Sequence, residues 1–530
     1  MTLRDSVGPQ GRSGARWTAA AVALSALALG ACNESFIPNY NNPTTFSATQ
    51  AGLTNAVFGV YNPRADQGNW AIWSSGMSRE ATYFTSSEQR FVTELTGKAS
   101  IQPDDFIGGT VWDAEFGNIK TADTTLALLP QVTIEGLSLT PGQVEAMYGV
   151  IETGKVYNYM LTLESRDTLG VPMNAVGESS APFAPILCAD LAWGEIVAML
   201  DSAVDSLTVA GATPIPINLP GGFSQNVTLN DNAADFMAVT LALRGKARVE
   251  YAYAIARQAG GATTGTLGGA AVPQLDSAEA DLQASPVLYV PLSLTDAVPG
   301  NDPGAYFVYS PSSGDLLNPV FQDIKGYYGL KLYVDGLHGD TLDARWASKF
   351  VNLGAVPTAP SAAGVASSWN YSNNLSGSSS LPIIRGVEMH YLVARAEFGL
   401  GHVAGAKDSI DLIRENVGGL GAGTVGPSPA AVAAYIVQQA QISFIAEGTG
   451  EDVAAIRDFG LQSEFQTNYA PNDLETTVLP IPVTETDPRG GNVTPVCTGA
   501  ASQTTPKPAA KAVKPAATPL SKHFGTIKLH

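Results

Sequence analysis

The strongest constraint on the fold is a pair of apolar stripes with helical spacing, separated by a glycine-containing break. The first stripe recurs at intervals of 4, 3 and 4 residues, at Val387, Tyr391, Ala394 and Phe398. After Gly399-Leu400-Gly401 the same intervals return, at Ala406, Ile410, Ile413 and Val417. Such spacing places each stripe on one face of a helix, so residues 385–419 are expected to form an antiparallel helix hairpin. Gly418-Gly419 marks the end of its second helix.

Helical patterns recur along most of the chain, although it contains no strict sequence repeat. They fall at residues 46–62, 110–129, 142–165, 189–207, 233–258 and 430–447. Degenerate helix pairs of this kind predict a mainly α fold with a tetratricopeptide-like helical-repeat core, an α-α superhelix. Long excursions rich in Gly, Pro, Ser and aromatic residues separate the helices, at about 66–108, 208–230 and 260–384. Connections of this length are usually functional or disordered.

The composition is that of a folded, acidic protein. Hydrophobic residues make up 45% of the 530 residues and charged residues only 15%, so the chain can bury a large core. The formal net charge is -19. An acidic body repels phosphate backbones, and we therefore expect no nucleic-acid partner.

The N-terminus has the pattern of an export signal. Basic residues precede an apolar stretch from Ala19 to Leu29, which is too short to span a bilayer comfortably. Leu29-Gly30-Ala31-Cys32 then looks like a bacterial lipobox; the alternative is an ordinary cleaved signal with an incidental cysteine. We interpret residues 1–31 as a lipoprotein signal peptide and Cys32 as the lipid anchor that holds the protein to a membrane. The polar residues 32–45 are predicted to form a flexible leash.

Three further features are interpreted from composition and spacing. Residues 498–530 carry five lysines and no acidic residue, which predicts a basic disordered tail. Cys188 and Cys497 are either a disulfide or two unpaired thiols. The run Asn230-Asp231-Asn232 with Asp235 hints at calcium, but a helix cap is the favoured interpretation, and no metal site is predicted.

Five segments, in order, resemble motifs of the SusD/RagB family. They are Leu169-Gly170-Val171-Pro172-Met173, residues 381–397, Ile413-Arg414-Glu415-Asn416-Val417, residues 447–460, and Leu479-Pro480-Ile481-Pro482. Each motif alone is weakly specific, whereas five in the correct order behind a lipobox are together fairly specific. The family's Arg in the fourth motif is absent here, where the chain reads Glu447-Gly448-Thr449-Gly450. The resemblance therefore identifies a divergent member, with residues 46–497 as its helical domain.

The resemblance implies a function as well as a fold. Members of the family are lipoproteins of the bacterial outer membrane that face the exterior and cover a SusC-like TonB-dependent transporter. By this resemblance the chain binds a nutrient, a glycan or else a peptide, and delivers it to that channel. It implies no cofactor and no enzymatic activity. Two alternatives stay open: a non-catalytic helical-repeat scaffold of the cell envelope, and a surface glycoside hydrolase with an unrecognised acid pair.

The candidate ligand-binding residues are aromatic and polar side chains in the first excursion. A sugar presents an apolar C–H face and a rim of hydroxyl groups, so its site needs exposed rings and nearby polar groups. The predicted ligand-binding residues are Trp70, Trp73, Tyr83, Phe84 and Arg90. The alternative is that these rings fasten a long loop to the helical core. No catalytic residues are predicted.

Overall fold

The computed structural model describes residues 47–497, except for residues 63, 86, 105, 174–182, 224–230, 261–264, 313–315, 323–325, 335–341, 357–365, 372–374, 467–473 and 492. The predicted signal peptide, Cys32, the leash and the basic tail therefore lie outside the described residues. None of the helices in the described part of the chain combines the length and apolarity that a membrane span requires.

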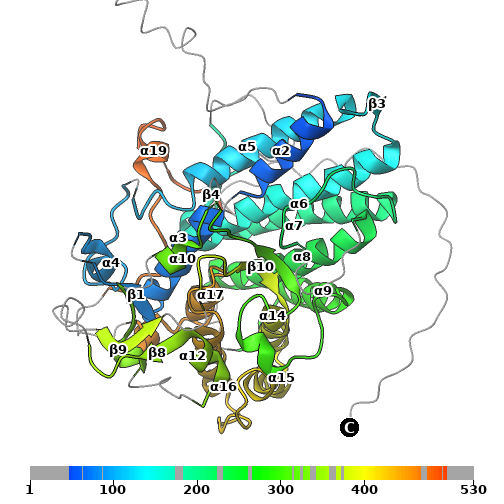
Figure 1. The fold of residues 1–530 in the computed structure, drawn as a ribbon. Coiled ribbons are helices and arrows are strands. Elements are labelled where there is room, and N and C mark those ends of the chain that lie inside the picture. Colours follow the sequence, from blue (N-terminus) through cyan, green and yellow to red (C-terminus); the bar gives the residue numbers. More distant parts are fainter. Residues whose placement is uncertain are drawn as a thin grey trace, which may run out of the picture.

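The first half of the fold is a row of helices in which each one packs against the next along the chain (Figure 1). The row consists of α5 (Asp113–Leu128), α6 (Pro141–Arg166), α7 (Ala189–Ala210), α8 (Ala233–Gln258) and α9 (Ala271–Ala284). Close packing within the row depends on small residues. At Gly149 of α6, a Cβ atom would lie 2.4 Å from the Leu207 side chain of α7, so only glycine fits there without rearrangement.

The second half continues the row. It consists of α14 (Gly386–Gly399), α15 (Val403–Asn416), α16 (Pro429–Ser443) and α17 (Glu451–Asp458). Because α14 packs against both α9 and α8, the two halves share one core. At the other end, α2 (Gln50–Val60) packs against α5 and α6. The predicted hairpin over 385–419 and the mainly α, helical-repeat architecture are thus confirmed.

Two of the predicted excursions contain more regular structure than expected. The helix α3 (Arg64–Met77) occupies much of the excursion 66–108, and α9 lies within the excursion 260–384, so the interpretation of these segments as loops is wrong. In α9 the buried stripe is short, with Leu275, Ala278 and Leu282 at its centre. Glycine-rich sequence before it and acidic residues on its outer face hide this stripe from a search for periodicity.

A small antiparallel sheet and several short pairings lie beside the helices. The sheet has the strand order β1-β7-β9-β8, which brings β1 of the first excursion against β7 of the third. Its strands are β1 (Ala81–Tyr83), β7 (Tyr327–Leu330), β9 (Ala366–Tyr371) and β8 (Phe350–Asn352). The two-stranded pairs are β6 (Gly304–Phe307) with β10 (Leu381–Arg385), β4 (Val171–Pro172) with β5 (Ile186–Leu187), and β2 (Thr133–Ile134) with β3 (Leu137–Ser138).

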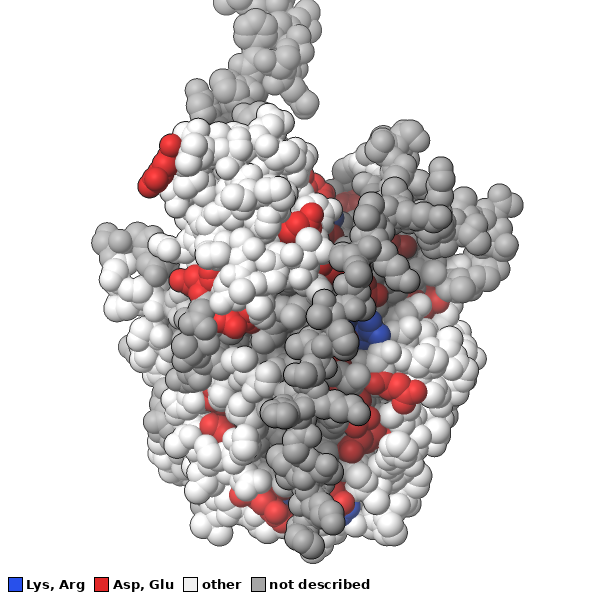
Figure 2. All heavy atoms as spheres, turned by 90° about the vertical axis from the view of Figure 1, so that its right-hand side faces the viewer, with Lys and Arg blue, Asp and Glu red and all other residues white. Residues whose placement is uncertain are grey.

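Short helices complete the described chain. The α-helical ones are α4 (Arg90–Thr93), α10 (Pro319–Gln322), α11 (Lys331–Tyr333), α12 (Ala344–Lys349), α18 (Gln462–Phe465) and α19 (Val483–Thr486). The 3-10 turns are η2 (Leu129–Gln131), η3 (Asp167–Leu169) and η4 (Leu294–Ala297). In the molecular surface, acidic side chains are spread over the face shown in Figure 2 and basic ones are few, as the net charge requires.

A buried cluster of ion pairs joins four helices at the centre of the fold. The Lys246 ammonium of α8 lies 3.0 Å from Glu164 of α6, 3.1 Å from Glu388 of α14 and 3.3 Å from Glu451 of α17. Arg395 of α14 bonds the Glu451 carboxylate at 2.6 Å. Burial raises the pKa of Glu164 to about 7 and that of Glu388 to about 8, although Lys246 opposes the shift. These carboxyl groups therefore hold protons more tightly in the folded protein than in the unfolded chain.

The structure shows how Cys188 and Cys497 are joined and which residue caps α8; Asn230 lies outside the described residues. Cys188 and Cys497 form a disulfide whose Cα atoms lie 5.0 Å apart, so the end of the described chain is joined to the start of α7. The Asn232 side chain accepts a hydrogen bond from the Asp235 amide at 3.0 Å, which makes Asn232 the cap of α8. Among the described residues, no group of three or more His, Cys, Asp or Glu side chains is placed to hold a metal ion.

Candidate ligand-binding site

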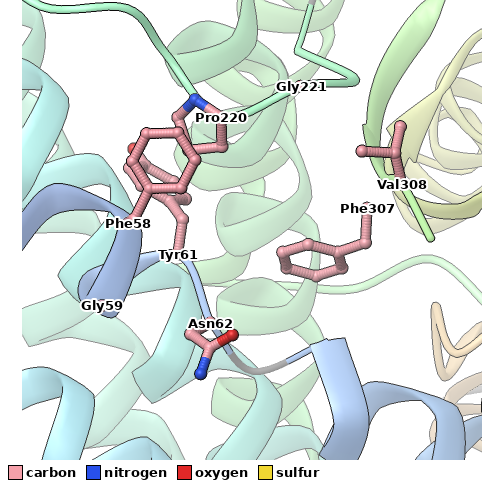
Figure 3. Close-up of a pocket in the computed structure, with 8 residues that line it drawn as sticks. All are labelled: Phe58, Gly59, Tyr61, Asn62, Pro220, Gly221, Phe307 and Val308. Carbon is pink, nitrogen blue, oxygen red and sulfur yellow. The ribbon is translucent and has the colours of Figure 1, made fainter. Parts of the chain in front are cut away.

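A pocket of about 490 Å³ opens where three segments that are distant in the sequence meet (Figure 3). The end of α2 contributes Phe58, Gly59, Tyr61 and Asn62, the loop after α7 contributes Pro220 and Gly221, and the end of β6 contributes Phe307 and Val308. The volume lies within the range that protein sites for small ligands usually have.

The phase of α2 decides which of its aromatic residues reach the pocket. Leu53, Val57 and Val60 are buried against the core, and Thr49 caps the helix by accepting from the Gly52 amide. Because successive residues of a helix are rotated by about 100°, Phe58 points away from the face that Val57 buries. Its side chain is 43% exposed.

Tyr61 forms the wall of the pocket behind Phe58. It follows the last turn of α2 and is buried, with its hydroxyl donating to the Val150 carbonyl of α6 at 2.6 Å. Asn158 of α6 donates to the Val60 carbonyl at 2.9 Å and fixes the same turn. Burial raises the pKa of Tyr61 well above its usual value, so the phenol stays uncharged. The wall is therefore rigid and neutral.

The opposite side of the pocket is built by β6 and the loop beside it. The Tyr306 amide donates to the Gly222 carbonyl at 3.0 Å, which draws residues 220–223 alongside the strand. Gly222 has a φ of +95°, and a Cβ atom there would lie 2.3 Å from the Tyr306 carbonyl oxygen, so glycine is required. The Phe307 ring packs on Tyr157 of α6, with centroids 5.9 Å apart, and points across the pocket in Figure 3.

The chemistry of the lining suits a ligand with one apolar and one polar surface. The exposed ring of Phe58, with Pro220 and Val308, provides apolar contacts, and the exposed Asn62 provides an amide. The Phe307 ring also lines the pocket but is only 3% exposed. Such sites bind through many apolar contacts and a few polar groups that orient the ligand. The described lining contains no Asp or Glu, whereas most glycoside hydrolases need two carboxyl groups beside the bond that is cut.

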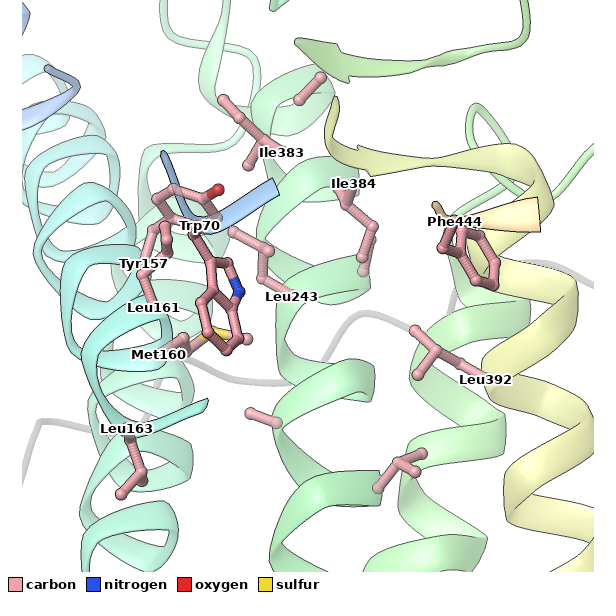
Figure 4. Packing of buried hydrophobic residues seen from close by; sticks show 14 of the residues in the cluster. Trp70, Tyr157, Met160, Leu161, Leu163, Leu243, Ile383, Ile384, Leu392 and Phe444 are labelled. Carbon is pink, nitrogen blue, oxygen red and sulfur yellow. The ribbon is translucent and has the colours of Figure 1, made fainter. Parts of the chain in front are cut away.

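Three of the predicted ligand-binding residues are buried, and the expectation that their rings are exposed is wrong. Trp70 is 0% exposed, and Trp73 and Phe84 are also buried. Figure 4 shows the Trp70 ring in the core, beside Tyr157 and Met160 of α6. Trp70 and Trp73 are buried because α3 lies inside the fold, against β1 and α17, and Phe84 is buried because it packs against Tyr328 of β7.

The other two predicted residues lie at the surface. Tyr83 is half-buried and packs edge-on against Phe91, with ring centroids 5.3 Å apart. The Arg90 guanidinium lies 4.7 Å from the Phe106 ring centroid and pairs with Glu88 at 2.8 Å. Tyr83, Arg90 and the exposed Phe106 are called the Phe106 patch below. Ligand contact by Tyr83 and Arg90 stays a prediction.

Sequence reasoning missed all the residues that line the pocket. A signal was present for Phe58, because an aromatic residue directly after the buried Val57 falls off the apolar face of α2. Pro220 and Phe307 gave no such signal, since their position depends on the contact between β6 and the loop.

Known structures with the same fold were found, although no family model and no curated protein sequence matches the chain. Surface glycan-binding protein A from Bacteroides thetaiotaomicron is 16% identical, with a TM-score of 0.58 over 84% of this chain and 98% of that one. The same protein in complex with laminarihexaose gives 14% identity and a TM-score of 0.57, again over 84% and 98%. A SusD superfamily protein from Bacteroides vulgatus gives 14% and 0.54, over 86% and 99%. The predicted resemblance to SusD proteins is thus confirmed for the fold.

Proposed function

We propose that this chain, which has the fold of SusD superfamily proteins, is a non-catalytic glycan-binding protein with its site in the Phe58–Phe307 pocket. The observation that carries the proposal is an aromatic ring, Phe58, held 43% exposed at the mouth of a neutral, largely apolar pocket. Two solved proteins of the same fold, from Bacteroides thetaiotaomicron and Bacteroides uniformis, are described as glycan-binding, which supports a glycan over a peptide as the ligand.

We propose further that the protein lies on the exterior of the bacterial outer membrane, anchored through a lipid at Cys32. There it would deliver its ligand to a SusC-like TonB-dependent transporter. The lipobox-like Leu29-Gly30-Ala31-Cys32 supports the anchor. Incorporation of labelled palmitate into the wild type, and its loss in Cys32→Ala, tests this part of the proposal. A wild-type chain that takes up no label would contradict it.

The Phe106 patch is proposed as a second, weaker contact for long glycans. Its exposed ring and the Arg90 guanidinium combine an apolar face with hydrogen-bond donors, as a sugar requires. Arg90 already pairs with Glu88 and Asp104, and these bonds would have to be shared with a ligand. The contribution of the patch is therefore expected to be small.

Calorimetric titration of the mature protein with laminarihexaose and other neutral hexaoses tests the site. We expect Phe58→Ala to weaken binding of the best hexaose about tenfold, equivalent to about 1.4 kcal/mol, because the stacking surface is lost. Phe183→Ala is the matched control, since Phe183 is also a surface phenylalanine and is 44% exposed. If the two variants bind the hexaose equally well, the Phe58–Phe307 pocket is not the binding site.

The same protein samples distinguish the alternatives. Release of shorter sugars, followed by chromatography, would favour a glycoside hydrolase. Binding of peptides but of no hexaose would assign the pocket to a peptide. Capture of envelope proteins with no small ligand in any screen would favour a scaffold.

A further inference from the structure

Among the described residues that line the pocket, none carries a formal charge. The lining consists of aromatic, aliphatic and glycine residues with a single amide, from Asn62. In this described lining the one ionisable group is the Tyr61 phenol, which donates to the Val150 carbonyl. A ligand that enters this pocket therefore exchanges water for apolar surface and a few neutral dipoles.

Such a lining is expected to bind an anionic sugar residue weakly. A carboxylate or sulfate that leaves water needs charged or strongly polarised donors in return, usually from Arg, Lys or the amides of a helix N-terminus. The uncompensated transfer of an ionised group costs several kcal/mol even after relaxation. No described Lys or Arg lines the pocket to compensate it.

The helix ends near the pocket carry partial charges of opposite sign. Phe58 and Gly59 belong to the last turn of α2, where the helix dipole is negative, and that turn contains no basic residue. The positive end of α3 follows at Arg64, and the formal charges of Arg64 and Asp66 in its first turn cancel, so this helix start adds only the partial charge of its dipole. The net charge of -19 adds a longer-range repulsion.

We infer that the Phe58–Phe307 pocket selects uncharged sugar residues and rejects uronic-acid and sulfated ones, an inference that rests on the proposed glycan-binding function. Selection against charge is local, because it arises from desolvation inside the pocket. It persists in 1 M salt, where the Debye length falls to about 3 Å and the repulsion by the whole protein is screened.

The test compares neutral and anionic hexaoses on the mature protein. Laminarihexaose, cellohexaose and maltohexaose are titrated beside hexagalacturonate and hexamannuronate, in 0.1 M and in 1 M salt. We expect the best neutral hexaose to bind at least tenfold more tightly than either anionic one at both salt concentrations. An anionic hexaose that binds as tightly as the neutral ones, and loses its affinity in Phe58→Ala, overturns the inference but leaves glycan binding intact.

A positive charge introduced into the pocket should reduce the preference for neutral hexaoses. Asn62→Arg is expected to improve binding of an anionic hexaose at least tenfold, because a guanidinium pairs with its carboxylates. Val308→Lys, at the opposite wall, is the second variant in case Asn62→Arg unfolds. The control is Leu412→Arg, which adds the same charge at an exposed site on α15 and should improve nothing. No gain in either folded pocket variant overturns the inference, whereas a failure of every hexaose to bind the wild type overturns the proposed function.

Discussion

The aromatic segment 70–91 and the end of α2 both contain aromatic side chains, yet Trp70 is buried and Phe58 is exposed. In the segment, Trp70, Trp73 and Phe84 are close together in the sequence and buried in the fold. In the pocket, Phe58 is 43% exposed, whereas Phe307, which is distant in the sequence, is 3% exposed and forms part of the wall. The difference shows that a local concentration of aromatic residues does not indicate exposure. What decides exposure is the side of its element on which each ring lies.

The largest expected effect concerns Trp70. Trp70→Ala should lower the free energy of unfolding by about 3–5 kcal/mol, because a fully buried indole is replaced by a cavity. Phe58→Ala should lower it by only about 1 kcal/mol, since 43% of the residue is already exposed. Urea unfolding of both variants measures the contrast. A Trp70→Ala protein as stable as the wild type would break the distinction between a core segment and a binding pocket.

The next largest effect is expected on the pH dependence of stability, which the buried ion cluster should determine and the neutral pocket should not. The folded protein holds the Glu388 proton up to pH about 8, whereas an unperturbed Glu releases it near 4.5. The folded state therefore binds more protons between these values, and stability falls as pH rises from 5 to 8, by up to about 1.4 kcal/mol per pH unit. Glu388→Gln cannot ionise and should reduce this slope in urea unfolding at pH 5, 6, 7 and 8, leaving the part that Glu164 contributes.

Glu415→Gln is the control for this slope. Glu415 lies exposed on α15, and its variant should keep the slope of the wild type. Hexaose affinity of the wild type should stay constant over the same pH range, because the described pocket lining contains no group that titrates there. A slope unchanged in Glu388→Gln would show that Glu388 ionises in the folded protein as it does in water.

A smaller effect is expected within the pocket itself. Phe58→Leu keeps an apolar side chain but loses the flat ring, and should weaken hexaose binding by about 1 kcal/mol, or roughly fivefold. Phe58→Tyr keeps the ring and should bind like the wild type. Calorimetric titration of the pair separates ring stacking from general apolar contact. Equal affinities of the Leu and Tyr variants would reduce the role of Phe58 to hydrophobic burial.

The smallest effect is expected at the Phe106 patch. Arg90→Ala and Tyr83→Ala should weaken binding of a long β-glucan about twofold and leave hexaose binding unchanged, because only a long chain reaches both surfaces. Stability should change by no more than about 1 kcal/mol in Arg90→Ala, as for other exposed ion pairs. Affinity electrophoresis with laminarin measures the first effect. A loss of hexaose binding in either variant would move the principal site from the pocket to the patch.

Several elements of the fold were predictable because their signals are local. Helix periodicity and caps placed α6, α7, α8, α14 and α15 near their observed bounds, since the apolar face and the capping residues of a helix lie within one segment. The family motifs were also visible in the sequence. The structure shows what some of their residues do: Arg385 bonds Glu447 at 2.8 Å inside the core, and Glu388 pairs with Lys246.

What the sequence by itself determined is the set of helices, their pairing into a mainly α fold and the resemblance to SusD proteins. The tertiary structure alone decided that Trp70 is buried, that Cys188 bonds Cys497 and that Phe58 faces Phe307. The physical reason is one of range. Periodicity and capping act between residues a few positions apart, whereas a pocket, a disulfide or a buried ring depends on which distant segments come into contact.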